Sequence, residues 1–342
     1  MLQERIARNL IVPLNRPDVY YRQSQTTLGH DPHNIGYWGI HIYLDCICSS
    51  MNVNYDDTKR AKKIFVTAAI ISIIALSPTL MNGTSFFERA NAQAMCSDEN
   101  NTSSSPKSPK TLPVILIHGY NEPPSIWSHW QHRLDGDGIR YCTVSFSDDE
   151  CGSALDHSQE LSQIVQQVKS WTPHNQVNIV GHSKGGLDAR QYLADSATND
   201  VANLIMIGTP NSGDRLANEV LSTPGLTFDF YNLACRPALD DLKFGANDTQ
   251  VPANPHTNYH TIAGNWSPSS GNFCTFYWSL SLTSDQLAKL GEVPNDGLVP
   301  ISSVESAPNS TSLGHTSNCH TDLTLSDDEY TLSQDILRGG AS

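Results

Sequence analysis

A serine flanked by glycines, between an apolar run and a helical pattern, is the feature that most constrains how this chain folds. Gly181-His182-Ser183-Lys184-Gly185-Gly186 follows the apolar segment 175–180 and precedes 187–193, which is typical of a helix. Side chains at the flanking glycine positions would collide with the neighbouring strand and helix. The pattern predicts a buried strand, a sharp turn and a helix, with the Ser183 hydroxyl raised above a sheet. A glycine-rich turn with an incidental serine is the alternative.

A second apolar run, 112–117, predicts an interior parallel strand that ends in His-Gly-Tyr-Asn at 118–121. The glycine lets the main chain approach a bound molecule closely. The main-chain N–H groups of Tyr120 and Lys184 are therefore candidate donors to an oxyanion. We expect His118 to be buried and to support the loop. We expect the Lys184 side chain to be solvated, so that its main chain matters more than its charge.

A carboxylate and an imidazole downstream complete the set that a reactive serine needs. Asp296 lies in an Asn-Asp-Gly segment, where a short polar side chain can point back into a cleft, although a plain turn is the alternative. Two histidines compete for the role of base. His320 precedes a helix that the pattern places from about 326 to 337 and is favoured, whereas His315 is interpreted as a surface loop residue.

Together these segments resemble the bacterial triacylglycerol lipases of the α/β-hydrolase superfamily over residues 112–338. The resemblance rests on segments 117–120, 181–190, 208–213, 295–299 and 320–322. It implies an α/β-hydrolase fold, with a mostly parallel central sheet flanked by helices and with lid-like insertions. The lipases usually have Gly-Thr-Pro-His at 208–211, and Asn211 replaces that histidine here, which puts the contact under the active-site floor in doubt.

The resemblance also implies a mechanism that requires no cofactor. His320 would take the proton of Ser183 as the hydroxyl attacks an ester carbonyl, and Asp296 would hold the imidazole in the correct tautomer. The main-chain N–H groups of Tyr120 and Lys184 would bind the tetrahedral oxyanion. The substrate would be a lipid or a small ester, with contact to a lipid interface. A short-chain carboxylesterase, a polyester depolymerase, an acyltransferase and a non-catalytic binding protein are the alternatives.

Some of these lipases hold a structural calcium ion near the catalytic histidine, with an aspartate two residues after it. Asp322 matches that one position, and no second aspartate in the sequence matches the other ligand. The resemblance therefore makes Asp322 the one candidate ligand for a structural calcium ion. The chain has a net charge of −14 and no basic stripe, so nucleic acid is excluded as a partner.

The chain divides into an unassigned part, an export signal, a linker and a catalytic domain. A basic cluster precedes the apolar run 64–80, and Ala-Gln-Ala ends at Ala94, so residues 51–94 are typical of a signal peptide cleaved after Ala94. An uncleaved membrane anchor through 64–80 is the alternative. If Met51 is the true start, residues 1–50 are not translated. Residues 95–111 are a Ser/Pro-rich linker, and 112–342 form one catalytic domain that ends outside the cytoplasm.

Six of the eight cysteines follow Ala94, and in an exported chain they are expected to form disulfides. Six cysteines allow fifteen connectivities. Cys142 and Cys151 are the pair most easily joined, and a bridge at Cys319 would fix the loop of the base.

The remaining patterns predict strands at 139–146, 201–207 and 259–264 and an amphipathic helix at 155–171. Two long insertions, 212–256 and 266–294, lie beside the predicted site. The second contains an aromatic stretch, 273–282, that is interpreted either as a lid or acyl-chain wall or as a helix that packs on the sheet.

Overall fold

The computed structural model describes residues 92–97, 110–148, 151–196, 199–222, 235–246 and 251–339, all within the unit Thr58–Ser342. The predictions for residues 1–50 and for the apolar run 64–80 lie outside the described residues. None of the helices in the described ranges has the length and hydropathy of a membrane-spanning segment.

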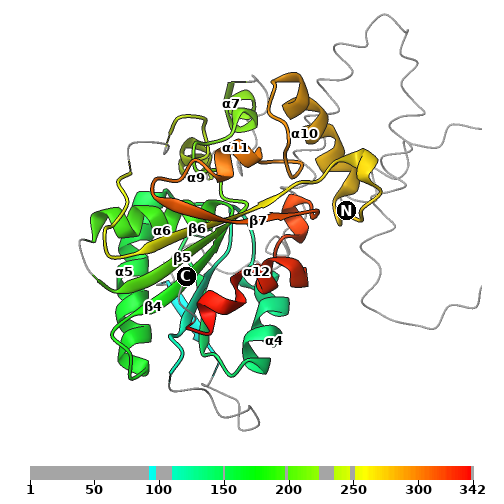
Figure 1. Ribbon diagram of the computed structural model, residues 1–342. Helices are drawn as coiled ribbons and strands as arrows, with labels where there is room; N and C mark the ends of the chain where they lie inside the picture. Colours follow the sequence, from blue (N-terminus) through cyan, green and yellow to red (C-terminus); the bar gives the residue numbers. More distant parts are fainter. Residues whose placement is uncertain are drawn as a thin grey trace, which may run out of the picture. The chain divides into compact units, whose positions relative to one another are not determined.

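A seven-stranded sheet forms the centre of the fold, in the order β1-β3-β2-β4-β5-β6-β7. Figure 1 labels the strands from β4 to β7. The first pair, β1 and β3, is antiparallel, and every other neighbouring pair is parallel. The strands are β1 Gln93–Cys96, β2 Val114–Ile117, β3 Tyr141–Ser145, β4 Val177–His182, β5 Val201–Ile207, β6 Asn258–Gly264 and β7 Ser310–Thr316. The prediction of a mostly parallel sheet is confirmed.

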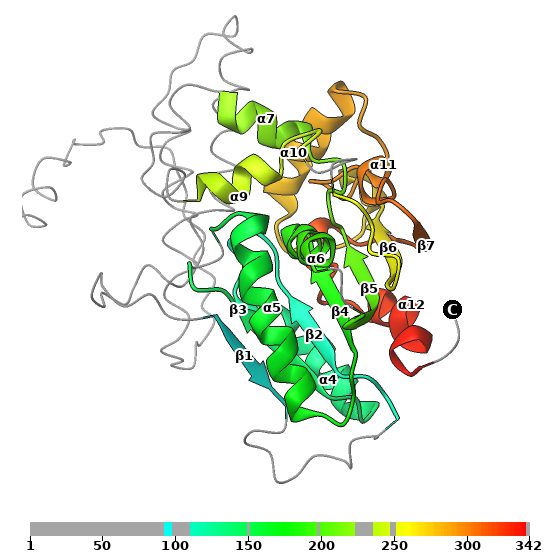
Figure 2. The ribbon, with the colours of Figure 1, turned by 90° about the vertical axis from the view of Figure 1, so that its left-hand side faces the viewer.

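Helices cover both faces of the sheet (Figure 2). Helices α5 and α6 pack on one face, and α4 and α12 on the other. The helices are α4 Ser128–Gly136, α5 Ala154–Trp171, α6 Lys184–Asp195, α7 Arg215–Ser222, α9 Arg236–Asp241, α10 Tyr277–Lys289, α11 Ile301–Val304 and α12 Asp327–Leu337, with short 3-10 turns η3 Pro124–Trp127, η4 Pro268–Ser270 and η5 His320–Asp322.

The continuous apolar run of β2 follows from this layering. Ile115 and Ile117 point into the core beneath α5 and α6, whereas Val114 and Leu116 point into the core beneath α4 and α12. Because both faces of the strand are buried, every position is apolar and no polar alternation survives.

Two strands were not predicted. β1 takes in Gln93 and Ala94, and Ala94 is buried in the core, so the sheet begins upstream of the expected start at residue 112. β7 is an edge strand whose side chains are largely exposed, so it lacks the apolar run that marks the interior strands.

Three disulfides join the cysteines of the described ranges: Cys96–Cys142, Cys151–Cys235 and Cys274–Cys319. The pairing of Cys142 with Cys151 was wrong, because Cys142 lies opposite Cys96 on the neighbouring strand β1, while Cys151 lies beside the start of α9. Cys319, the neighbour of His320, is bridged to Cys274. Disulfides of this number are typical of proteins that fold in an oxidising compartment.

Candidate active site

Ser183 occupies the sharp turn between β4 and α6. Its backbone dihedrals are φ 51° and ψ −123°, a conformation that a non-glycine residue adopts only under strain. The flanking glycines are required by close approach, as predicted. A Cβ on Gly181 would lie 2.6 Å from the Gly186 nitrogen, and a Cβ on Gly185 would lie 2.4 Å from the His118 carbonyl oxygen.

Asp296 and His320 meet although 24 residues separate them. The imidazole Nδ1 of His320 lies 2.8 Å from Asp296 Oδ2, and both side chains are buried. The His320 main-chain N–H also donates to the Asp296 carbonyl oxygen at 2.9 Å. The other carboxylate oxygen of Asp296 accepts from the N–H groups of Leu298 and Val299, at 2.9 and 2.7 Å. Asp296 is thereby held as a fixed acceptor for the imidazole.

The pKa of His320 is raised above its usual 6.5. Burial alone would lower the pKa, but the charge and hydrogen bond of Asp296 outweigh burial, and the carboxylates of Glu122 and Asp214 act in the same direction. Asp214 is itself buried close to this site, and burial, together with the charge of Asp296, raises its pKa to about 7.

The serine turn contacts the loop of the base through His182. The ring of His182 lies against the ring of His320, with 4.8 Å between the centroids. Its Nε2 donates to the His320 carbonyl oxygen at 3.1 Å, and its Nδ1 lies 2.7 Å from Glu122 Oε2. Neither contact was predicted from the sequence, in which a glutamate three residues after the glycine at 119 is the available signal.

His315, the competing base, lies at the surface on β7. Its Nε2 is 2.8 Å from Glu305, and the side chain is 41% exposed. The structure therefore brings His320, and not His315, to Asp296.

The loop after β2 passes over Ser183. A Cβ on Gly119 would lie 2.8 Å from the Ser183 Cβ, so the loop main chain lies directly beside the serine, with Tyr120 next along the chain. His118 is buried, and its ring packs edge-on against Phe146 as expected of a loop support.

The expectation for the Lys184 side chain was wrong. It is 1% exposed, and its Nζ donates to Asp188 Oδ1 at 2.6 Å. Asp188 Oδ2 in turn lies 3.0 Å from Nδ1 of His157, and the Nε2 of His157 lies 3.1 Å from Asp148. The first turn of α6 faces α5, so the lysine enters a buried charge cluster between the two helices.

Asn211, which stands where the lipases have histidine, is fully buried beneath the site. Its Nδ2 donates to the Val304 carbonyl oxygen at 2.7 Å, and its Oδ1 and carbonyl oxygen accept from Arg190. The amide therefore joins α6 to α11 through hydrogen bonds at both its nitrogen and its oxygen, and this settles the contact that the substitution put in doubt.

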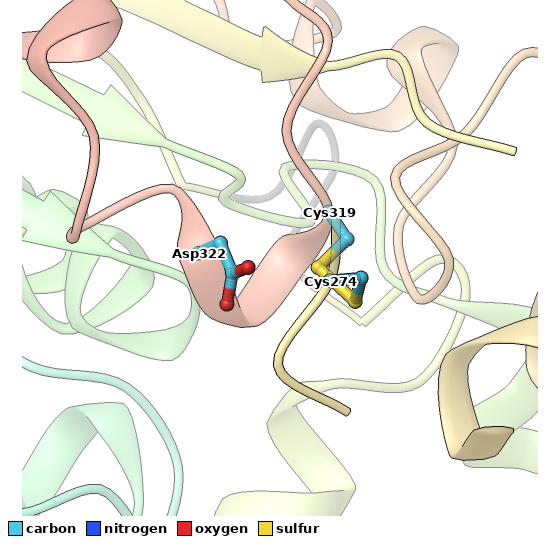
Figure 3. Close-up of side chains that lie close together, drawn as sticks. All are labelled: Cys274, Cys319 and Asp322. Carbon is cyan, nitrogen blue, oxygen red and sulfur yellow. A yellow bond between two sulfur atoms is a disulfide. The ribbon is translucent and has the colours of Figure 1, made fainter. Parts of the chain in front are cut away.

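The calcium role of Asp322 stays a prediction, and among the described residues the metal-ligand side chains grouped with it are two cysteines. Its Oδ2 accepts the Thr275 N–H at 3.0 Å, and its Oδ1 lies 3.3 Å from the Thr321 hydroxyl. Cys274 and Cys319 lie near Asp322 and could in principle bind a metal ion, but their sulfur atoms are joined in a disulfide (Figure 3). Calcium requires six to eight oxygen ligands, and this group offers one carboxylate.

Helix α10 packs on the loop that carries the acid. Ser284 donates to the Asn295 side chain at 3.0 Å, and Thr283 donates to the Gly297 carbonyl oxygen. Leu280 lies in a small apolar cluster with Trp266 and the Cys274–Cys319 disulfide. This face of the aromatic insertion is a packed helix, and a lid function for the segment stays a prediction.

A family model for palmitoyl protein thioesterase matches residues 113–256, a range that contains Ser183 but neither Asp296 nor His320. A triacylglycerol lipase of Pseudarthrobacter phenanthrenivorans is 32% identical over 115 residues, which cover 32% of this chain and 36% of the relative. A triacylglycerol lipase of Burkholderia plantarii is 32% identical over 115 residues, which cover 32% of either chain. The chain spans about a third of the length of these curated relatives.

The mature form of Bacillus licheniformis lipase BlEst2 is a solved structure with a similar fold. It aligns with a TM-score of 0.59 and 21% identity, over 72% of this chain and 98% of that one. The chain therefore has the α/β-hydrolase fold that the sequence predicted, and the resemblance of its sequence to triacylglycerol lipases is confirmed.

Proposed function

We propose that this chain is an exported serine ester hydrolase, a lipase that cleaves carboxylic esters of acylglycerols through an acyl-enzyme on Ser183. The observation that carries the proposal is the buried Asp296–His320 pair, whose histidine ring lies against His182, the residue before a serine on a strained turn. Sequence similarity to triacylglycerol lipases supports the substrate class. Contact with a lipid interface is part of the proposal.

The proposed chemistry follows from the hydrogen bond between Asp296 and His320. The Asp296 carboxylate only accepts, so His320 carries its hydrogen on Nδ1 and presents the lone pair of Nε2. That nitrogen takes the Ser183 proton as the hydroxyl oxygen attacks the ester carbonyl carbon. The proton then passes to the leaving alcohol. Water repeats the sequence on the acyl-enzyme, which releases the acid and frees the serine.

Two main-chain donors are assigned to the tetrahedral oxyanion, the N–H groups of Tyr120 and Lys184. The Lys184 N–H lies at the first residue of α6, where the helix dipole favours negative charge. Loss of one such donor costs roughly 3–4 kcal/mol of transition-state stabilisation.

Export is supported by the three disulfides, which an oxidising compartment allows to persist. Cleavage of the proposed signal after Ala94 would remove Gln93 and Ala94 from β1. N-terminal sequencing of the exported chain will locate the processing site, and a peptide from residues 2–50 would exclude Met51 as the start.

A chain-length series tests the function. p-Nitrophenyl esters from acetate to palmitate should be turned over with a preference for long acyl chains, and a fluorophosphonate should label the wild type but not S183A. Turnover of the short esters alone would favour a carboxylesterase. A wild type that neither turns over any ester nor takes the label would refute the proposal and favour a binding protein.

A further inference from the structure

The loop after β2 is held by a side chain that the proposed mechanism does not use. Residues 119–122 form a turn in which the Glu122 N–H donates to the Gly119 carbonyl oxygen at 3.4 Å, and Asn121 has a φ of 55°. The Glu122 carboxylate then folds back, and its Oε2 accepts the Gly119 N–H at 2.8 Å. The side chain is 22% exposed, so it reaches inward from a loop near the surface.

The same oxygen also faces the serine turn. Oε2 of Glu122 lies 2.7 Å from Nδ1 of His182, the residue that precedes Ser183. The opposite ring nitrogen of His182 lies 3.1 Å from the His320 carbonyl oxygen. Both acceptors need a hydrogen on the ring nitrogen that faces them.

The carboxylate stays ionised in this position. Burial alone would raise the pKa of Glu122, but the charge of His182 and the hydrogen bond to it lower the pKa to about 2. Both contacts of Oε2 are thus charge-assisted hydrogen bonds, which are stronger than neutral ones.

The main chain at Gly119 is closely packed between Glu122 and Ser183. A Cβ there would lie 2.7 Å from Glu122 Oε2 and 2.8 Å from the Ser183 Cβ. The loop is therefore in contact with the carboxylate on one side and with the serine on the other.

We propose that Glu122 is a positioning residue that fixes the relative positions of three loops. They are the loop after β2, the turn that carries Ser183 and the loop that carries His320. The inference rests on the proposed function. Glu122 acts through Gly119 on the first loop, through His182 on the second, and through His182 and the His320 carbonyl on the third. It touches no substrate atom in this scheme, and its effect is on the rate of acylation.

Two variants test the proposal, E122Q and E122A, with E160Q as the matched control. Glu160 also accepts a main-chain N–H, that of Ser147 at 3.1 Å, and it contacts none of the three loops. In E122Q a neutral oxygen replaces the carboxylate, and kcat should fall about 10-fold. In E122A the tether is gone, and kcat should fall about 100-fold with KM changed less than about 3-fold.

Fluorophosphonate labelling separates positioning from a loss of folded protein. If Glu122 positions the loops, every chain of E122Q is labelled eventually, at a rate constant reduced as much as kcat. If Glu122 only stabilises the fold, fewer chains are labelled, at the wild-type rate constant, and that result would overturn the proposal.

A double variant covers the case in which E122A folds poorly. E122Q and H182Q break one chain of contacts, so their effects on kcat should not add, whereas each should add to that of the E160Q control. Full additivity of E122Q with H182Q would overturn the inference. A wild type that neither turns over esters nor takes the label would remove the proposed function and this inference together, whereas an active wild type with an unaffected E122Q would remove the inference alone.

Discussion

His157 and His320 are both buried against carboxylates, and they differ in how many of their ring nitrogens a carboxylate engages. His157 has a carboxylate at each nitrogen, Asp188 at Nδ1 and Asp148 at Nε2. His320 has Asp296 at Nδ1, while the part of the chain that the structure describes offers Nε2 no hydrogen-bond partner. Burial beside a carboxylate therefore does not by itself identify a base, and the proposed role of His320 depends on the ring nitrogen that the carboxylate leaves uncommitted.

The charge of each ring follows from the same contacts. Burial alone would lower the pKa of His157, but Asp188 and Asp148 raise it to about 9. At neutral pH this ring is a cation that cannot accept a proton. The Lys184 Nζ lies 3.2 Å from Nδ1 of His157, and this contact is a repulsion between like charges, because that nitrogen donates to Asp188. The cluster joins α5 to α6 through these contacts.

The largest expected effect separates the two histidines by activity. H320A should lower kcat by about 10⁴-fold, because the serine loses its base. H157A should leave the kcat of the folded enzyme within about 3-fold. Ester turnover normalised to the chains that are folded by circular dichroism measures both. An H157A variant that folds and loses as much activity as H320A would collapse the distinction.

The second effect separates the two aspartates by stability. D188N leaves the Lys184 charge buried with a neutral partner, and loss of one member of a buried pair costs about 3–5 kcal/mol. Urea unfolding should show this loss. D296N should lower kcat with a smaller change in unfolding, since the amide oxygen of the introduced side chain can still accept from the Leu298 and Val299 N–H groups. Equal losses of stability would show that both clusters serve packing.

The third effect separates the His157 site from the His320 site by what each changes with pH. The pKa of His157 is raised from 6.5 to about 9, so its stabilisation is complete below pH 6.5 and is lost as the pH rises through 9. The shift corresponds to about 3 kcal/mol. The His320 pKa is also raised, so kcat/KM should fall on the acid side, at a pH above 6.5.

Urea unfolding at pH 6 and pH 10 measures the alkaline loss of stability, and a pH–rate profile measures the fall of kcat/KM on the acid side. H157Q should remove the alkaline loss of stability and leave the acid limb of kcat/KM where it is. A shift of that acid limb in H157Q would couple the two clusters and contradict the separation.

The contrast between the His320 site and the buried cluster around Lys184 also shows what the sequence could predict. The interior strands could be predicted because each is a continuous apolar run. Asp296 and His320 could be predicted from the short motifs around them, and the structure brings these two side chains together as expected. The Lys184 environment could not be predicted, because it depends on which face of α6 meets α5. The edge strands β1 and β7 lack a two-sided apolar run, so tertiary pairing alone defines them.

The smallest effect concerns Lys184, which has its main chain in the proposed active site and its side chain in the buried cluster. K184M keeps the main-chain N–H, so kcat should change less than about 3-fold.

In K184M, Asp188 keeps His157 as its partner, so the buried carboxylate stays paired. Removal of the like charge raises the pKa of His157 further, because Lys184 lowers it in the wild type. The alkaline loss of stability should therefore begin at a higher pH in K184M than in the wild type, as followed by urea unfolding between pH 8 and 10. A fall of kcat by 100-fold with the fold intact would give the lysine charge, and not its amide, the role in catalysis.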